Sequence, residues 1–333
     1  MQATLKTLAK AVKAIKLCTS MIRQKINFDL CDFGARYDKN ENFFVRLLRE
    51  RFDLQLTTSP DYVLYCFGTE VHRLYTCKKI YFTPEADLPD FDECDYALTS
   101  RYVDDPRHFR VPYYVLSLKP ETLVKQPGEW EQILRQKSKF CCFMASYANR
   151  KTRLRTEFFQ KLNQRKKVDS AGRALNNIGF NVPFLAQAKN EFLQPYKFYM
   201  AFENQSVPGY VTEKLTDGMR ARCIPIYYGC PRVAEEFNPK SFLNYHDFPS
   251  EEALIDRIME IDGNDDLYAQ YLKEPFFIGD KPPAACDKTR FLDFFEGIFS
   301  STTPPVAARK RLLGRWMLIK RNFPHLPLPQ QPV

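Results

Sequence analysis

The sequence predicts an α/β protein of two Rossmann-like domains, and three observations support this fold class. The chain has 333 residues, which at about 100–200 residues per domain corresponds to two domains. Short apolar runs rich in aromatic and β-branched residues alternate with charged stretches of helical periodicity. The apolar runs are hydrophobic on both faces, as is typical of parallel strands whose sheet is covered by helices on both sides.

The first half of the chain contains four expected strands and one expected helix. The helix covers residues 43–52, because Phe44, Leu47 and Leu48 share one face of it. Residues 117–138 are polar without clear periodicity, which places the expected domain boundary near residue 138. The four strands are expected at residues 28–34, 62–68, 79–83 and 96–98.

The same alternation restarts after this boundary. We expect strands at residues 140–145, 197–202 and 223–228, and helices at residues 153–163, 212–222, 254–261 and 290–299. The expected parts are a basic amphipathic helix (1–25), an N-terminal Rossmann-like domain (26–137), a C-terminal Rossmann-like domain (138–300) and a basic, proline-rich tail (301–333).

Composition and charge exclude several classes of protein. With 44% hydrophobic and 14% aromatic residues, the bulk of the chain can bury cores and is not disordered. Residues 1–25 and 309–321 each carry six basic and no acidic side chains, so the formal charge of +9 becomes −3 for the remainder. A nucleic-acid binder needs its basic residues on a folded face, and no zinc-finger, helix-turn-helix or RNP pattern occurs. We therefore expect no nucleic-acid partner.

The two basic segments predict attachment to an anionic membrane surface. For residues 4–22, a basic-faced helix packed on the sheet remains the alternative. No run of about 18 apolar residues occurs, and Lys10, Lys13 and Lys16 interrupt the apolar stretch that a secretory signal would need. The expected location is cytoplasmic, peripheral at the inner membrane face.

The ten cysteines have no framework spacing and are expected to be buried, reduced thiols. Cys141 and Cys142 are adjacent on an expected strand, so they point to opposite faces and cannot be bridged.

Metal-binding patterns are weak in this sequence. The four histidines have no ligand-like spacing. Asp90 and Asp92 match the Asp-x-Asp element that some nucleotide-sugar enzymes use for a divalent cation, but their Pro- and Asp-rich context is typical of a turn. Residues 262–266 lack the glycine and glutamate positions of a calcium loop and are also expected to be a turn. We expect no required metal or cofactor; a cation such as Mn²⁺ is not expected to be essential.

The most informative pattern is a strand, a loop and a helix start. Glu203 and Asn204 close an apolar strand, a short loop follows, and Thr212 is a suitable cap for a helix that opens with Glu213 and Lys214. Such a strand-end loop before a helix is where an α/β sheet binds the phosphates of a nucleotide. A lysine in the first turn opposes the helix dipole, and a bound anion would remove that penalty.

These residues resemble the donor-binding motif of glycosyltransferase family 10, the α1,3/4-fucosyltransferases, and the soluble bacterial branch is the more similar. The resemblance covers about residues 78–300. The donor motif is carried by residues 202–214, 224–229, 237–242 and 246–248; residues 82–85, 91–97 and 105–112 resemble the acceptor side, and residues 143–163 the start of the donor domain.

The resemblance implies a GT-B fold, with two Rossmann-like domains facing across a cleft, and inverting transfer of fucose from GDP-fucose. It implies that residues 26–137 bind the acceptor and residues 138–300 bind GDP-fucose, and that the helix at residues 290–299 packs back on the first domain. Glu85 matches the presumed general base, and Glu213 matches a carboxylate near the donor ribose or the cationic transition state. The remaining matches are donor-binding residues: Arg155 and Lys214 for the pyrophosphate, with Asn204 and Tyr210 as further contacts.

The implied acceptor is a GlcNAc-containing, N-acetyllactosamine-like glycan, most simply fucosylated in α1,3 linkage. A lipid-linked or lipopolysaccharide-type acceptor would suit an enzyme at the cytoplasmic membrane face. Two alternatives stay open: a GT-B transferase that uses another nucleotide sugar, and a non-enzymatic membrane-surface or RNA-binding protein driven by its basic ends.

Overall fold

The computed structural model describes residues 23–34 and 38–306. Residues 1–22 of the expected N-terminal helix and residues 307–333 of the expected tail therefore lie outside the described residues. Within the described residues, no helix combines the length and the apolar character that crossing a membrane would require.

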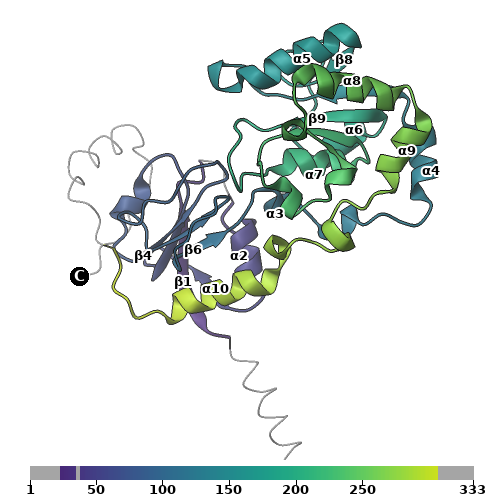
Figure 1. Ribbon diagram of the computed structural model, residues 1–333. Coiled ribbons are helices and arrows are strands. Elements are labelled where there is room, and N and C mark those ends of the chain that lie inside the picture. Colours follow the sequence, from purple (N-terminus) through teal and green to yellow (C-terminus); the bar gives the residue numbers. More distant parts are fainter. Residues whose placement is uncertain (1–22, 35–37, 307–333) are drawn as a thin grey trace, which may run out of the picture. The chain divides into compact units, whose positions relative to one another are not determined.

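The chain divides into two compact units (Figure 1). The second unit comprises Thr83–Leu88 and Thr99–Asp287, and the first comprises the described residues on either side of these segments. This division differs from the boundary expected near residue 138. Residues 99–137 belong to the second unit because Tyr114, Leu118 and Leu123 are buried in its core.

Within the first unit, the strands of the first sheet follow the order β2-β1-β3-β4-β5; β6 is next in this order, but its residues fall in the range of the second unit. The neighbouring strands from β2 through β5 in this order are all paired in parallel, as expected. Strands β2 and β6 were not predicted, because both are short and lie at the ends of the order. The strands are β1 (Lys25–Cys31), β2 (Asp53–Leu56), β3 (Tyr62–Tyr65), β4 (Lys78–Phe82), β5 (Tyr96–Thr99) and β6 (His108–Arg110).

Two helices, α2 (Phe43–Leu48) and α10 (Lys288–Ser300), pack beside β1 in the first unit (Figure 1). Phe299 of α10 makes edge contacts with Phe28 and Phe52, with ring centroids 6.5 and 5.0 Å apart. The chain therefore returns to complete the first core with its last described helix. This confirms the expectation that the helix packs on the first domain, although the expected boundaries had assigned it to the second.

The second unit is a five-stranded parallel sheet with the order β11-β10-β9-β7-β8. Cys141 and Cys142 lie on β7 and are buried in the cores on opposite faces of this sheet, as predicted. The strands are β7 (Lys139–Phe143), β8 (Val168–Ser170), β9 (Tyr196–Phe202), β10 (Ile224–Tyr228) and β11 (Leu243–Asn244).

Helices cover both faces of the second sheet. Helices α5, α8 and α9 contribute to the core on one face, and α3, α6 and α7 to the core on the other. Helices α5 and α8 lie side by side (Figure 1), where Lys161 pairs with Glu251 at 2.7 Å. The helices are α3 (Tyr114–Ser117), α4 (Glu129–Gln136), α5 (Arg153–Arg165), α6 (Ala186–Leu193), α7 (Glu213–Arg220), α8 (Glu251–Asp262) and α9 (Asp265–Lys273).

Sequence periodicity missed α4, α6 and α9. Helix α4 buries only Ile133 and α6 only Leu193, so neither presents the continuous apolar stripe by which a helix is recognised. The predicted turn at residues 262–266 is present, since α8 ends at Asp262 and Asn264 caps α9. Short 3₁₀ segments complete the fold: η1 (Val71–Leu74), η2 (Pro120–Leu123), η3 (Arg150–Thr152), η4 (Val233–Glu235), η5 (Pro239–Ser241), η6 (Tyr245–Asp247), η7 (Ile278–Asp280) and η8 (Ala284–Cys286).

A partly buried histidine makes the stability of the fold sensitive to acid. Burial lowers the pKa of His108 to about 4, and its Nε2 lies 2.9 Å from the hydroxyl of Thr99. In the unfolded chain its pKa returns to about 6.5. As the pH falls from about 6.5 to 4, the unfolded chain takes up a proton that the native chain does not, so the free energy of unfolding decreases.

We expect His108→Gln to lose part of this acid sensitivity, since glutamine stays neutral. Urea denaturation at about pH 7 and about pH 5 measures it. An unchanged pH dependence in His108→Gln would show that other groups are responsible.

Candidate functional site

A cavity of about 550 Å³ lies in the second unit. Its walls come from the residues that follow β7, β8 and β9 and from the start of α7. Because these strands are parallel, their carboxyl ends meet at one edge of the sheet, where α/β proteins bind ligands. All six predicted site residues line this cavity: Glu85, Arg155, Asn204, Tyr210, Glu213 and Lys214.

The loop between β9 and α7 has the local structure expected from its sequence. Thr212 caps α7, and its hydroxyl accepts a hydrogen bond from the backbone of Lys214. Gly209 has a φ of 92°, and a Cβ on this residue would lie 2.2 Å from the carbonyl oxygen of Ser100. Only glycine fits both the conformation and the space, so this residue fixes the path of the loop.

Lys214 is held by a buried carboxylate. Its ammonium group lies 2.9 Å from Glu203, which also accepts hydrogen bonds from the backbone and hydroxyl of Thr212 at 2.7 and 2.8 Å. Burial opposes the charge of Lys214, but the carboxylates of Glu203 and Glu213 outweigh it and raise the pKa of Lys214 to about 12. The lysine is therefore protonated and oriented, with much of its charge already neutralised.

Arg155 is buried, with 4% of its surface exposed, and it has only neutral hydrogen-bond partners. Its guanidinium donates to the side-chain oxygen of Asn204 at 2.8 Å and to the carbonyl oxygen of Tyr147 at 2.6 Å. Its Nε is buried and has no partner among the described residues. No carboxylate neutralises this charge, so an anion entering the cavity would gain a full charge-assisted interaction.

Glu85 follows β4, and its segment packs with the second unit. Its carboxylate accepts a hydrogen bond of 3.1 Å from the hydroxyl of Tyr210. Burial raises the pKa of that hydroxyl, so Tyr210 remains a donor. The cavity thus presents one carboxylate whose orientation is set by a neutral phenol.

Glu213 is the second carboxylate of the wall, and two lysines keep it ionised. Burial opposes its charge, but Lys214 and Lys189 outweigh this and lower the pKa of Glu213. Lys189 lies 3.7 Å from Glu213 and 3.0 Å from Asp217. Glu213 is therefore a carboxylate at neutral pH.

Sequence reasoning missed three charged residues of this site. Glu203 stood inside the recognised motif. The available signal was a carboxylate directly at the end of an apolar strand, in the same motif as Lys214. Lys189 and Arg173 line the cavity, but Lys189 lies in α6 and Arg173 follows β8, two elements that the sequence did not reveal.

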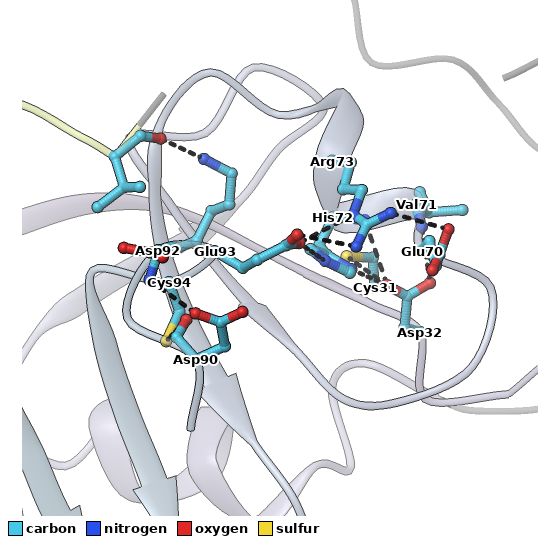
Figure 2. Close-up of polar contacts among 12 residues, drawn as sticks. Cys31, Asp32, Glu70, Val71, His72, Arg73, Asp90, Asp92, Glu93 and Cys94 are labelled. Carbon is cyan, nitrogen blue, oxygen red and sulfur yellow. Dashed lines mark hydrogen bonds and ion pairs between the residues drawn. The ribbon is translucent and has the colours of Figure 1, made fainter. Parts of the chain in front are cut away.

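Asp90 and Asp92 lie in the first unit and form a turn, as interpreted from the sequence (Figure 2). The carboxylate of Asp90 accepts a hydrogen bond of 3.0 Å from the backbone of Asp92. The neighbouring Glu93 is held by Arg73 through two hydrogen bonds of 2.8 and 2.9 Å. Among the residues that the structure describes, no three His, Cys, Asp or Glu side chains are grouped so as to hold a metal ion.

Two protein-family models match the chain. The model described as "Glycosyltransferase family 10 (fucosyltransferase) C-term" matches residues 134–274. The model described as "Alpha-(1,3)-fucosyltransferase FucT N-terminal domain" matches residues 27–117. Both matches agree with the resemblance found in the sequence.

Individual relatives support the same assignment. An α-(1,3)-fucosyltransferase of Helicobacter pylori is 31% identical over 267 residues, covering 68% of this chain and 55% of the relative. A 3-galactosyl-N-acetylglucosaminide 4-α-L-fucosyltransferase of Bos taurus is 32% identical over 180 residues, covering 53% of this chain and 45% of the relative. The chain thus spans about half the length of these curated relatives.

A solved structure shows the same fold. The crystal structure of an α1,3-fucosyltransferase with GDP-fucose has 28% sequence identity and a TM-score of 0.72, covering 85% of this chain and 93% of that one. This similarity confirms the predicted GT-B fold class. With both family models, a relative and a solved structure in agreement, the chain belongs to glycosyltransferase family 10, the fucosyltransferases.

Proposed function

We propose that this chain transfers L-fucose from GDP-fucose to a hydroxyl group of a GlcNAc-containing glycan, with inversion at the anomeric carbon. The observation that carries the proposal is the meeting of all six predicted residues at one cavity. Its buried Arg155 has no carboxylate partner and suits an anionic donor.

Donor binding rests on the basic wall of the cavity. Arg155 and Lys214 hold the diphosphate, and Asn204 and Tyr210 contact the donor. As the bond between fucose and phosphate breaks, negative charge grows on the leaving GDP. Cations already in place stabilise that charge without reorganisation. We therefore propose that no divalent cation is essential, although Mn²⁺ is not excluded as a stimulant.

Transfer to the acceptor requires a base. The acceptor hydroxyl oxygen forms a bond to the anomeric carbon from the face opposite to the leaving GDP, and its proton passes to Glu85. The tyrosine hydroxyl that donates to Glu85 holds the carboxylate in place. Glu213, kept ionised by its lysines, stabilises the positive charge of the sugar in the transition state or contacts the donor ribose.

The acceptor is proposed to be N-acetyllactosamine-like and carried on a lipid-linked or lipopolysaccharide-type glycan. The Helicobacter pylori relative is named an α-(1,3)-fucosyltransferase, which favours α1,3 linkage, whereas the Bos taurus relative is named a 4-α-L-fucosyltransferase. Both linkages therefore belong in the test.

The test is a glycan array assayed with GDP-fucose, GDP-mannose and UDP sugars, followed by linkage analysis of the product. We expect fucose transfer from GDP-fucose alone, unaffected by a chelator. Transfer from another nucleotide sugar would identify a different donor, and loss of activity restored by Mn²⁺ would contradict the cation arrangement. No turnover with any donor would reject the enzymatic function.

We further propose that the enzyme lies at the cytoplasmic face of a membrane, attached through its two basic segments. Basic residues near an anionic leaflet contribute about 1 kcal/mol each. Lys25 begins β1. The backbone N–H of Val306 donates a hydrogen bond of 2.7 Å to the carboxylate of Asp95, which directly precedes β5. The described residues next to the two segments therefore lie at the amino edge of the same parallel sheet, which favours joint attachment.

Vesicle co-sedimentation tests this attachment. The full chain should bind vesicles containing anionic lipid at low salt and release them at high salt, because exposed charges are screened. Variants with the arginines and lysines of either segment changed to glutamine should bind more weakly. Equal binding by the full chain and by a variant neutralised in both segments would exclude the electrostatic attachment.

A further inference from the structure

The charges around the cavity are not equivalent. Lys214 is paired with Glu203 at 2.9 Å, and Lys189 with Asp217 at 3.0 Å. These two lysines therefore offer little net charge to a ligand. Four basic side chains line the cavity: Arg155, Arg173, Lys189 and Lys214.

Arg173 differs from the two lysines because its side chain has no hydrogen bond or ion pair among the described residues. It is exposed to solvent, while it also lines the cavity. Arg173 and Arg155 are therefore the two basic side chains of the cavity wall that are not paired with a carboxylate. A GDP group brings a diphosphate with at least two negative charges, so two uncompensated cations suit it.

The backbone around Arg173 is fixed against the end of β7. Ala171 donates to the carbonyl oxygen of Phe143 at 3.0 Å, and Ala174 donates to that of Ala145 at 2.9 Å. A Cβ on Gly172 would lie 2.1 Å from the carbonyl oxygen of Ala145, so only glycine allows this approach. The side chain that follows is thereby anchored at the cavity wall and not on a loosely attached loop.

We propose that Arg173 is a further donor-binding residue, which acts with Arg155 on the diphosphate of GDP-fucose. This inference rests on the proposed function. It also ranks the basic residues: Arg155 and Arg173 provide the net charge, whereas Lys214 provides an oriented hydrogen-bond donor. Because Arg173 is exposed, its contribution decreases with ionic strength, whereas that of the buried Arg155 decreases less.

The test is calorimetric titration of Arg173→Gln with GDP, inorganic pyrophosphate and guanosine. We expect the Kd for GDP and pyrophosphate to rise about tenfold at low salt, and less than about threefold at about 0.5 M salt. Guanosine, which carries no phosphate, should bind as it does to the wild type. Arg173→Lys should recover part of the lost affinity. Arg153→Gln is the matched control, since Arg153 is an exposed arginine paired with Glu157 at 2.6 Å that does not line the cavity.

Two results would overturn the inference. One is a Kd for GDP in Arg173→Gln within about twofold of the wild type at low salt. The other is equal weakening of guanosine and GDP, which would indicate a change in structure. The proposed function can fail while this inference holds. That would be the result if the wild type binds pyrophosphate through Arg173 but transfers no fucose. A wild type that binds neither GDP nor pyrophosphate rejects both.

Discussion

Glu85→Gln is expected to lower kcat by about 10²–10⁴-fold while the Kd for GDP-fucose stays nearly unchanged. Glutamine keeps the size of the side chain and can still accept the hydrogen bond from Tyr210. It cannot take a proton from the acceptor hydroxyl. Because the base acts only in the transition state, its loss reduces turnover and not donor binding.

Steady-state kinetics and donor titration together measure this separation. Asp87→Asn is the matched control, because Asp87 is an exposed carboxylate two residues further along the same segment and does not line the cavity. It should retain wild-type turnover. A folded Glu85→Gln enzyme with near-normal kcat would remove Glu85 from the mechanism.

Arg155→Ala should weaken the binding of both GDP and GDP-fucose by about 10²-fold, since charge-assisted hydrogen bonds contribute about 1.5–3 kcal/mol. The guanidinium is buried and has no hydrogen-bonded carboxylate partner, so its charge is available to the donor. Titration with GDP measures the loss. Arg155→Lys should recover little, because lysine lacks the planar fork that reaches several acceptors.

Lys214→Met is expected to differ from Arg155→Ala, because it lowers the stability of the fold as well as the affinity for GDP. It leaves Glu203 buried without its cation, and such a loss costs about 3–5 kcal/mol of stability. The double change Glu203→Gln with Lys214→Met should restore folding without restoring GDP affinity. Loss of GDP binding in Lys214→Met but not in Arg155→Ala would reverse the roles assigned to the two residues.

The clustering of the six candidate residues at one cavity was easier to predict from the sequence than the division into units. Asn204, Tyr210 and Lys214 are consecutive parts of one strand, loop and helix, so their proximity follows from local structure alone. Arg155 joins them because its helix follows the neighbouring parallel strand, and this too is a consequence of the β-α pattern. Arg173 escaped notice because β8 has only three residues, too few to show any periodicity.

The division into two compact units differs from the expected boundary for a different reason. Helix α10 is amphipathic, and its buried Phe291, Phe295 and Phe299 could cover either sheet as far as the pattern shows. Which sheet it covers depends on complementary shape, such as the stacking of Phe291 on Phe44 at 5.8 Å. Long-range packing of this kind leaves no periodic signal in the chain.

The return of α10 to the first unit has a consequence for the order of folding. During synthesis the strands of the first unit leave the ribosome early, but their core lacks Phe291, Phe295 and Phe299 until α10 has been made. The second unit lies almost entirely within one continuous stretch, Thr99–Asp287, and has its complete core before α10 emerges. The unit that is translated first is therefore completed last, and until then Phe28 and Phe52 present apolar surface to chaperones.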